Sequence, residues 1–121
     1  MNIEQHLAAA GRIERSLRKC SAEDVEMQIE GAMLAGTHRL NAALHRMGAT
    51  QSANDVLHTY LLTVNEYRRL CVADNEMVRA LSEIEDLRPP FVRGNMPGAQ
   101  AAADRARALL SVTCSKATAA G

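Results

Sequence analysis

The stretch AEDVEMQIEGAMLAGTHRLNAALHRM, residues 22–47, decides the fold. Apolar residues recur in it every three or four positions, the spacing that gives an α-helix one apolar face. They are Val25, Ile29, Ala32 or Met33, Gly36, Leu40, Ala43 or Leu44, and Met47. Ser21 is a candidate N-cap with Asp24 three residues on, and Gly48 suits a left-handed C-cap. We therefore predict a helix over 22–47, about 39 Å long at 1.5 Å per residue.

The same periodicity predicts helices over 3–20, over 55 to about 71, from 74 or 75 to 87, and over 98 to about 112. Pro89-Pro90 ends the fourth, because proline cannot continue a helix. Whether the third and fourth are separate or form one bent helix stays open, since the break at 73–75 contains neither Gly nor Pro. Short connections predict an all-α, up-and-down bundle of four to five helices over 1–114, with a flexible tail over 115–121. Gly31 and Gly36 inside the long helix predict close approach of another helix.

Composition narrows the class of protein. The 121 residues suit one domain, and 47% apolar with 23% charged residues excludes wholesale disorder. Lys plus Arg and Asp plus Glu both number 14, so the zero net charge argues against a dedicated DNA-binding protein. Aromatic residues are only 2%, which disfavours a β-sheet core. No run approaches the ~20 apolar residues that span a bilayer, and no signal peptide is evident. We therefore expect no membrane association and a cytoplasmic protein.

The sequence predicts no metal site and no cofactor. Cys20, Cys71 and Cys114 are far apart and form no Cys-x-x-Cys pair, so we expect three reduced thiols. The Glu-x-x-His signature of di-iron bundles is absent. His38 and His45 lie two helical turns apart, ~10.5 Å along the axis, which is too far for one metal ion.

Polar residues form a second stripe beside the apolar one on the long helix. Glu30, Leu34, His38, Asn41 and His45 follow at steps of four, four, three and four. Two interpretations remain open: these side chains border the core or a dimer seam, or they form a polar site, because histidine transfers protons near neutral pH. We take His38, Asn41 and His45, together with His58, as candidate ligand-binding residues.

Charged residues offer two further hypotheses. Arg39 and His45 form an Arg-x5-His pair, but they lie ~120° apart around the helix, so a partner subunit or a helix end would have to complete a shared site. The basic residues cluster in the first helix and at 68–69, where we predict solvated helix faces and no nucleic-acid contact. Nucleic-acid binding by the first helix is the weaker alternative.

The layout resembles the HEPN superfamily of helical domains over residues 24–110. The resemblance is carried by EGAMLAGTHRLNAALHRMG (30–48), the stretch around Leu57-His58, LRPPFVRG (87–94) and PGAQAAADRARALL (97–110). It implies a homodimeric bundle, a small nucleotidyltransferase as a partner protein and, in active members, a metal-independent ribonuclease with an Arg-x4–6-His motif. That motif usually has a polar residue after the arginine and lies late in the chain. Here Leu40 follows Arg39, and the pair lies early.

These observations predict a non-catalytic binding or assembly module. We expect a homodimer that binds a partner protein or small ligand through a groove along the 22–47 helix, without catalytic residues. The alternative is a toxin-like ribonuclease in which His45 acts as acid or base and Arg39 stabilises the phosphate.

Overall fold

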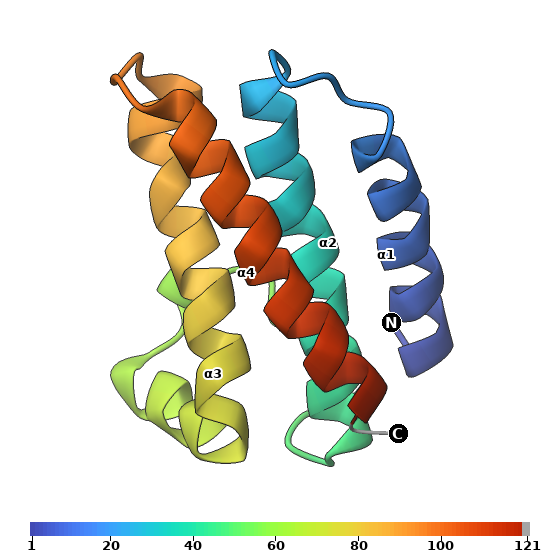
Figure 1. Ribbon diagram of the computed structural model, residues 1–121. Coiled ribbons are helices and arrows are strands. Elements are labelled where there is room, and N and C mark those ends of the chain that lie inside the picture. The colour runs from blue at the N-terminus through green and yellow to red at the C-terminus, as the bar shows by residue number, and fades with distance from the viewer. Residues whose placement is uncertain (120–121) are drawn as a thin grey trace.

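The structure, a computed structural model, describes the backbone of residues 1–119 and the side chains of residues 1–115. It is an all-α bundle of four helices: α1 (Ile3–Leu17), α2 (Val25–Arg46), α3 (Val64–Arg88) and α4 (Ala99–Ala119). Consecutive helices run in opposite directions, and α4 crosses α2 obliquely (Figure 1). Residues 1–119 contain no β-strand. The predicted all-α class and up-and-down arrangement are therefore confirmed.

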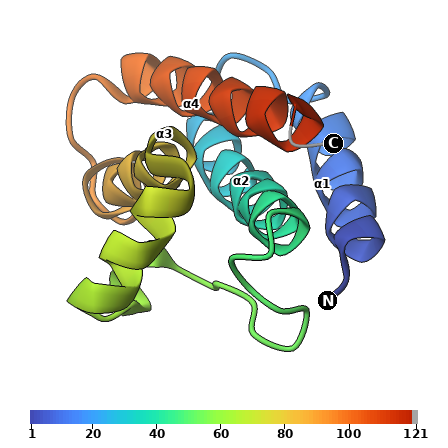
Figure 2. The same ribbon diagram turned by 90° about the horizontal axis from the view of Figure 1, so that it is seen from below.

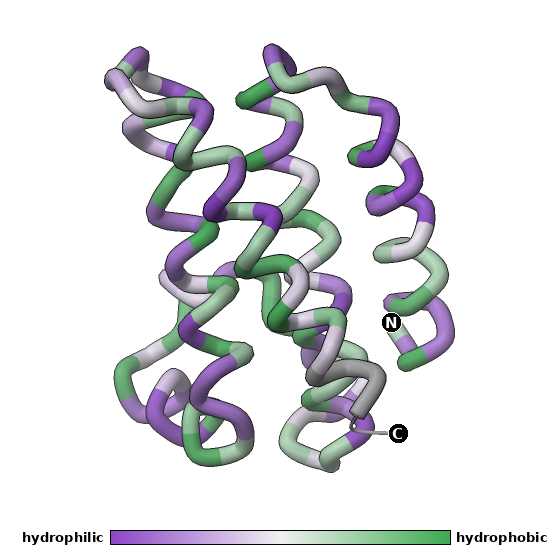
Figure 3. Tube along the Cα trace, viewed as in Figure 1, coloured by the Kyte–Doolittle hydropathy of each residue, from purple (hydrophilic) through white to green (hydrophobic). Residues whose placement is uncertain are grey.

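Helix α2 lies at the centre of the bundle and packs against α1, α3 and α4. Hydrophobic and hydrophilic residues alternate along each helix, as the predicted amphipathic faces require (Figure 3). The largest apolar side chains of the core are fully buried: Ile29, Leu40, Leu44, Leu70, Met77, Leu81 and Ile84. Each such burial contributes about 1.5–3 kcal/mol to folding, so the core accounts for the association of the helices.

Gly31 lets α1 approach α2 closely, as the sequence predicts. A Cβ at this position would lie 2.3 Å from Leu17 Cδ2, well inside van der Waals contact. Gly36 faces α3, where a Cβ would lie 3.4 Å from Leu81 Cδ1, which is an ordinary contact distance. The missing side chain of Gly31 therefore leaves room on α2 for the Leu17 side chain of α1.

Helix α3 consists of two helical stretches joined by a kink at Asp74, which answers the question that the sequence left open. Asp74 has extended dihedral angles (φ −157°, ψ 97°), and its Oδ1 accepts a hydrogen bond of 3.0 Å from the backbone N–H of Met77. An aspartate that caps the following turn in this way can interrupt a helix without Gly or Pro.

The predicted start of the third helix at residue 55 is wrong, because α3 begins at Val64. Thr63 is its N-cap and accepts a hydrogen bond from Glu66 N–H. The preceding residues 47–63 form a loop that includes one short 3₁₀ turn, η1 (Thr59–Leu61). Outside its short turns, the backbone of this loop bonds to side chains of α2 and α3, at Val56 and Thr59. Seen from below, the loop lies at the same end of the bundle as the N-terminus (Figure 2).

Other helix ends differ from the predicted ones by a turn or less. Helix α1 stops at Leu17, and α2 begins at Val25 because Asp24 Oδ2 binds the backbone N–H and the hydroxyl of Ser21 in a turn before the helix. Gly48 has the predicted positive φ, +75°.

The chain beyond α3 also departs from the predicted boundaries. After Arg88 it forms one π-helical turn, η2 (Pro89–Arg93), although the sequence predicts that Pro89-Pro90 ends the helix: the two prolines end the α-hydrogen-bonding pattern but not the coiling. Helix α4 continues to Ala119, past the predicted end near 112. The flexibility of the tail 115–121 stays a prediction, and its residues 120–121 lie outside the described residues.

Candidate functional site

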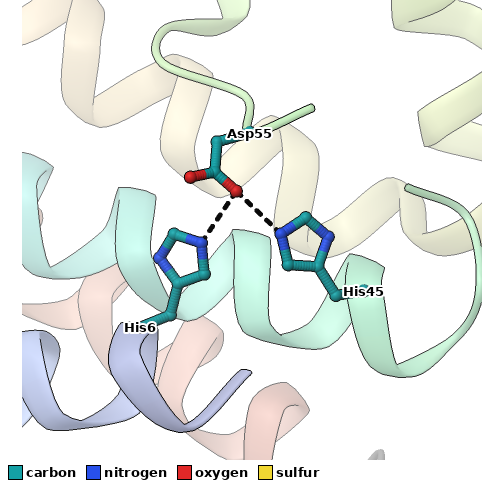
Figure 4. A group of neighbouring side chains, drawn as sticks. All are labelled: His6, His45 and Asp55. Atoms are coloured by element: carbon teal, nitrogen blue, oxygen red, sulfur yellow. Dashed lines mark hydrogen bonds and ion pairs between the residues drawn. The ribbon is translucent and has the colours of Figure 1, made fainter. Parts of the chain in front are cut away.

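Two histidines from different helices converge on one carboxylate at the loop end of the bundle. Asp55 Oδ1 lies 2.9 Å from His6 Nε2 and 2.8 Å from His45 Nε2. His6 comes from the first turns of α1, His45 from the last turn of α2, and Asp55 from the loop, so the three residues join three separate segments (Figure 4). The side chains of His6 and His45 are 2% and 4% exposed, whereas that of Asp55 is 20% exposed. Only the carboxylate therefore reaches solvent to any extent.

The outer atoms of the three side chains also have partners. His6 Nδ1 lies 3.0 Å from His38 Nδ1, and His45 Nδ1 lies 2.6 Å from the hydroxyl of Thr50. The α-amino group of Met1 donates to Asp55 Oδ2 over 2.9 Å. The histidine–carboxylate cluster, which we define as His6, His38, His45 and Asp55, is thus a continuous hydrogen-bonded network.

The surroundings of the cluster fix its charges. Burial alone would raise the pKa of Asp55, but hydrogen bonds from the Met1 amine, His6 and His45 outweigh it and hold that pKa well below its usual range. Burial lowers the pKa of His38, and the nearby charges of His6 and Arg12 lower it further. Asp55 is therefore an anion at neutral pH, and His38 favours its neutral form.

These charges determine where the protons lie. An ionised carboxylate only accepts hydrogen bonds, so His6 and His45 each carry a proton on Nε2. One of the two facing Nδ1 atoms, of His6 and His38, then donates a hydrogen bond to the other over 3.0 Å. The network can shift protons between tautomers, because Thr50 and His38 can each act as donor or acceptor.

Asn41, a predicted ligand-binding residue, holds the loop in place. Its Nδ2 donates to the carbonyl oxygen of Val56 over 2.7 Å and to that of Thr37 over 2.8 Å, and its Oδ1 accepts from Val56 N–H over 2.7 Å. The residue is 1% exposed. Because the amide of Asn41 hydrogen-bonds backbone groups of the chain, it is not available to a ligand. Asn41 instead fixes the position of Val56 and so of its neighbour Asp55.

His58 lies apart from the other three predicted ligand-binding residues. Its Nδ1 is 2.9 Å from Glu85 Oε2, and its ring stacks on Tyr60 with centroids 4.6 Å apart. Glu85 is buried and also accepts hydrogen bonds from the backbone N–H and the hydroxyl of Thr59. The structure thus divides the predicted set: His38 and His45 join the cluster, Asn41 supports it, and His58 belongs to a second anchor of the loop on α3.

Arg39 and His45, the alternative catalytic pair, have different partners within the chain. Arg39 forms two hydrogen bonds with Glu14, of 3.0 Å from Nε and 2.6 Å from Nη2. The thiol of Cys114 donates to the same carboxylate over 3.3 Å. Burial alone would raise the pKa of Glu14, but the hydrogen bonds from Arg39 and Cys114 outweigh it and lower that pKa. Arg39 therefore links α2 to α1 and α4, and it does not meet His45.

We expect Cys114 to react slowly with alkylating reagents. Burial and the Glu14 carboxylate raise its pKa from 9.0 to about 11, so at pH 8 its thiolate is roughly 100-fold less abundant than that of an ordinary thiol. Peptide mass spectrometry after iodoacetamide treatment measures the rate, and the same chain in urea is the control. Between pH 9 and 11 the folded chain keeps a proton that the unfolded chain loses, so this thiol lowers stability as the pH rises. Equal rates in the folded and unfolded chains would contradict the assignment.

The sequence reasoning missed His6 and Asp55. A signal for His6 existed, because it lies three residues after Ile3 and four before Ala10 on the predicted apolar face. A histidine in that position is buried and needs a polar partner. Asp55 gave no periodic signal, since its partners come from segments 49 and 10 residues away.

No known protein family, curated protein or solved structure matches this chain. The resemblance to the HEPN superfamily therefore stays a prediction. Among the described residues, none of the helices combines the length with the apolar character that crossing a bilayer requires.

Proposed function

We propose that the chain is a non-catalytic assembly module that forms a homodimer. The observation that supports this most is the 57–64 segment, which surrounds η1. Four large apolar side chains within these eight residues, Leu57, Tyr60, Leu61 and Val64, are each between 61% and 66% exposed. A monomer rarely leaves so many large apolar groups of one short segment in water, and such surfaces usually mark interfaces.

A second copy of the chain is the partner that this segment suits best. A two-fold symmetric interface places the same surface opposite itself, so an apolar segment meets an apolar segment. The formal net charge of zero gives two copies no long-range repulsion. Glu85 and Asn41 hold the neighbouring Thr59 and Val56 rigidly, so little conformational entropy is lost when the segment is covered.

The groove along α2 that the sequence predicts is the second candidate surface. An apolar groove of about 170 Å³ lies between α1 and α2, and it is lined by Ile13, Leu17, Met27, Gly31 and Leu34, among others. Met27 is 62% exposed. Of the large apolar side chains that line this groove only Met27 and Leu34 are exposed, against four in the 57–64 segment, so we place the dimer contact at the segment.

Light scattering coupled to size-exclusion chromatography tests the proposal. We expect a dimer for the wild-type chain and a monomer for Leu61→Lys, because a charged side chain in the centre of an apolar interface has to be desolvated. Met27→Lys is the matched control, with similar exposure on the other surface. A monomeric Met27→Lys with a dimeric Leu61→Lys would move the contact to the groove along α2, and a monomeric wild type would refute the homodimer.

The ribonuclease alternative makes a separate forecast. Since Arg39 is bound by Glu14 and His45 by Asp55 and Thr50, no contact among the described residues favours a joint catalytic role. Purified dimer should therefore leave single-stranded RNA intact. Metal-independent cleavage that is lost in His45→Ala would overturn the non-catalytic proposal.

A further inference from the structure

We propose that His6, His45 and Asp55 bind one divalent transition-metal ion. Their ligand atoms, two imidazole nitrogens and one carboxylate oxygen, lie within 4.8 Å of one another. Two histidines and one carboxylate form a common ligand set for Zn²⁺ and Fe²⁺, with further coordination positions open to water or a ligand. The inference does not depend on dimer formation.

The distances in the cluster are close to those that a metal ion requires. Tetrahedral ligands at 2.0–2.1 Å from Zn²⁺ lie about 3.3 Å from one another. Asp55 Oδ1 is already 2.9 Å and 2.8 Å from the two Nε2 atoms. Both imidazoles point toward the same carboxylate oxygen (Figure 4). Because both Nε2 atoms are directed at Oδ1, an ion bound to both would lie near the present position of Oδ1, and the Asp55 side chain would withdraw toward its loop to coordinate it.

His6 and His45 can each adopt the tautomer that metal binding at Nε2 requires. Metal binding at Nε2 requires each neutral imidazole to carry its proton on Nδ1 instead. His45 Nδ1 then donates to the hydroxyl oxygen of Thr50, and His6 Nδ1 donates to His38 Nδ1. Both distances, 2.6 Å and 3.0 Å, already lie in hydrogen-bonding range. The chain thus contains the outer hydrogen bonds that orient histidine ligands in metal sites.

Asp55 provides the negatively charged ligand, and its solvent-exposed side provides a path by which an ion can reach the site. Asp55 Oδ2 binds the Met1 amine, which leaves Oδ1 directed at the two histidines as a single-atom ligand. The Asp55 side chain is 20% exposed, and a cavity of about 390 Å³ that it lines together with Thr50 opens beside it. An ion can enter from this side and keep water in an open position. The backbone of Val56, bonded to Asn41, keeps Asp55 in place.

The spacing argument from the sequence does not exclude this site. That argument concerns His38 and His45, and His38 is not one of the three proposed ligands: it contacts His6 at Nδ1, the ring nitrogen that does not face Asp55. The second histidine ligand comes from α1 and the carboxylate from the loop. A bound ion would therefore join α1, α2 and the loop.

Titration of untagged protein with Zn²⁺ by calorimetry tests the proposal. We expect one ion per chain, and we expect affinity to fall by about 100-fold or more in His6→Gln and in Asp55→Asn. His58→Ala is the matched control, because it removes a histidine of the second anchor, and it should bind Zn²⁺ as the wild type does. Mg²⁺ should not compete, since it prefers oxygen ligands. Circular dichroism of each variant checks that the bundle is retained.

Two measurements on the wild-type chain keep the test independent of variant folding. The visible spectrum of the Co²⁺ complex should indicate nitrogen and oxygen ligands, without the near-ultraviolet band of a thiolate ligand. The ring-proton NMR signals of His6 and His45 should shift on Zn²⁺ addition while those of His58 stay in place. Absence of Zn²⁺ binding, thiolate ligation, or equal binding by wild type, His6→Gln and Asp55→Asn would each refute the site.

Discussion

Asn41→Ala should lower the free energy of unfolding by about 3 kcal/mol, because it leaves two buried backbone groups without a partner. The amide of Asn41 satisfies both the N–H and the carbonyl oxygen of Val56, each over 2.7 Å, and Val56 is itself buried. Alanine cannot replace either bond, and water cannot reach the site unless the loop opens. The effect should therefore exceed that of an ordinary side-chain hydrogen bond, which contributes about 1 kcal/mol.

Urea denaturation followed by circular dichroism measures this change. Asn54→Ala is the matched control: it removes the same group from the same loop, but Asn54 is exposed, and we expect a change within about 0.5 kcal/mol. The backbone amide signal of Val56 in NMR spectra should move in Asn41→Ala only. Equal stability of the two variants would show that Asn41 does not fix the loop.

Glu85→Ala should destabilise the chain by a similar or larger amount, about 3 kcal/mol or more. Its carboxylate accepts hydrogen bonds from the backbone N–H and the hydroxyl of Thr59, and it contacts His58 Nδ1 over 2.9 Å. Thr59 is 3% exposed, so both of its donors would be left unsatisfied in the interior. The loop would lose its attachment to α3, as Asn41→Ala removes its attachment to α2.

Thermal and urea unfolding of three variants tests this expectation. Glu85→Gln keeps an oxygen acceptor for Thr59 and should lose only about 1 kcal/mol. Asp86→Ala, at the exposed neighbouring position, should have little effect. If Glu85→Gln were as unstable as Glu85→Ala, the negative charge rather than the hydrogen bonds would hold Thr59. If all three variants matched the wild type, the anchor would have no role in stability.

The helices could be predicted from the sequence because their information is local. The spacing of Ile29, Leu40 and Leu44 indicates the buried face of α2 without knowledge of any partner, and all three are in the core. The same reasoning failed at residues 55–63, where apolar residues at Leu57, Tyr60 and Leu61 imitate a helical stripe. These side chains are exposed, since the backbone there is fixed by polar groups from other segments.

The candidate site could be predicted only in part. The stripe on α2 placed His38 and His45 on one side of a helix, and the structure brings both into the cluster. Their connection runs through His6 and Asp55, and it depends on how α1 and the loop pack. Contacts of this kind arise from tertiary packing, so the spacing of residues along one helix cannot predict them. For the same reason the Arg-x5-His spacing suggested a pair, while Arg39 turned to Glu14 on α1.

The packing of α1 on α2 has a consequence for how the molecule opens. In the described part of the chain, α1 packs extensively only on α2, whereas α2, α3 and α4 also pack on one another. This outer helix can consequently detach as a unit while the other three stay assembled, and it would carry His6 away from Asp55. Binding of an ion at the proposed site and docking of α1 would thus be thermodynamically linked, so an ion held by His6, His45 and Asp55 would stabilise the docked position of the first helix.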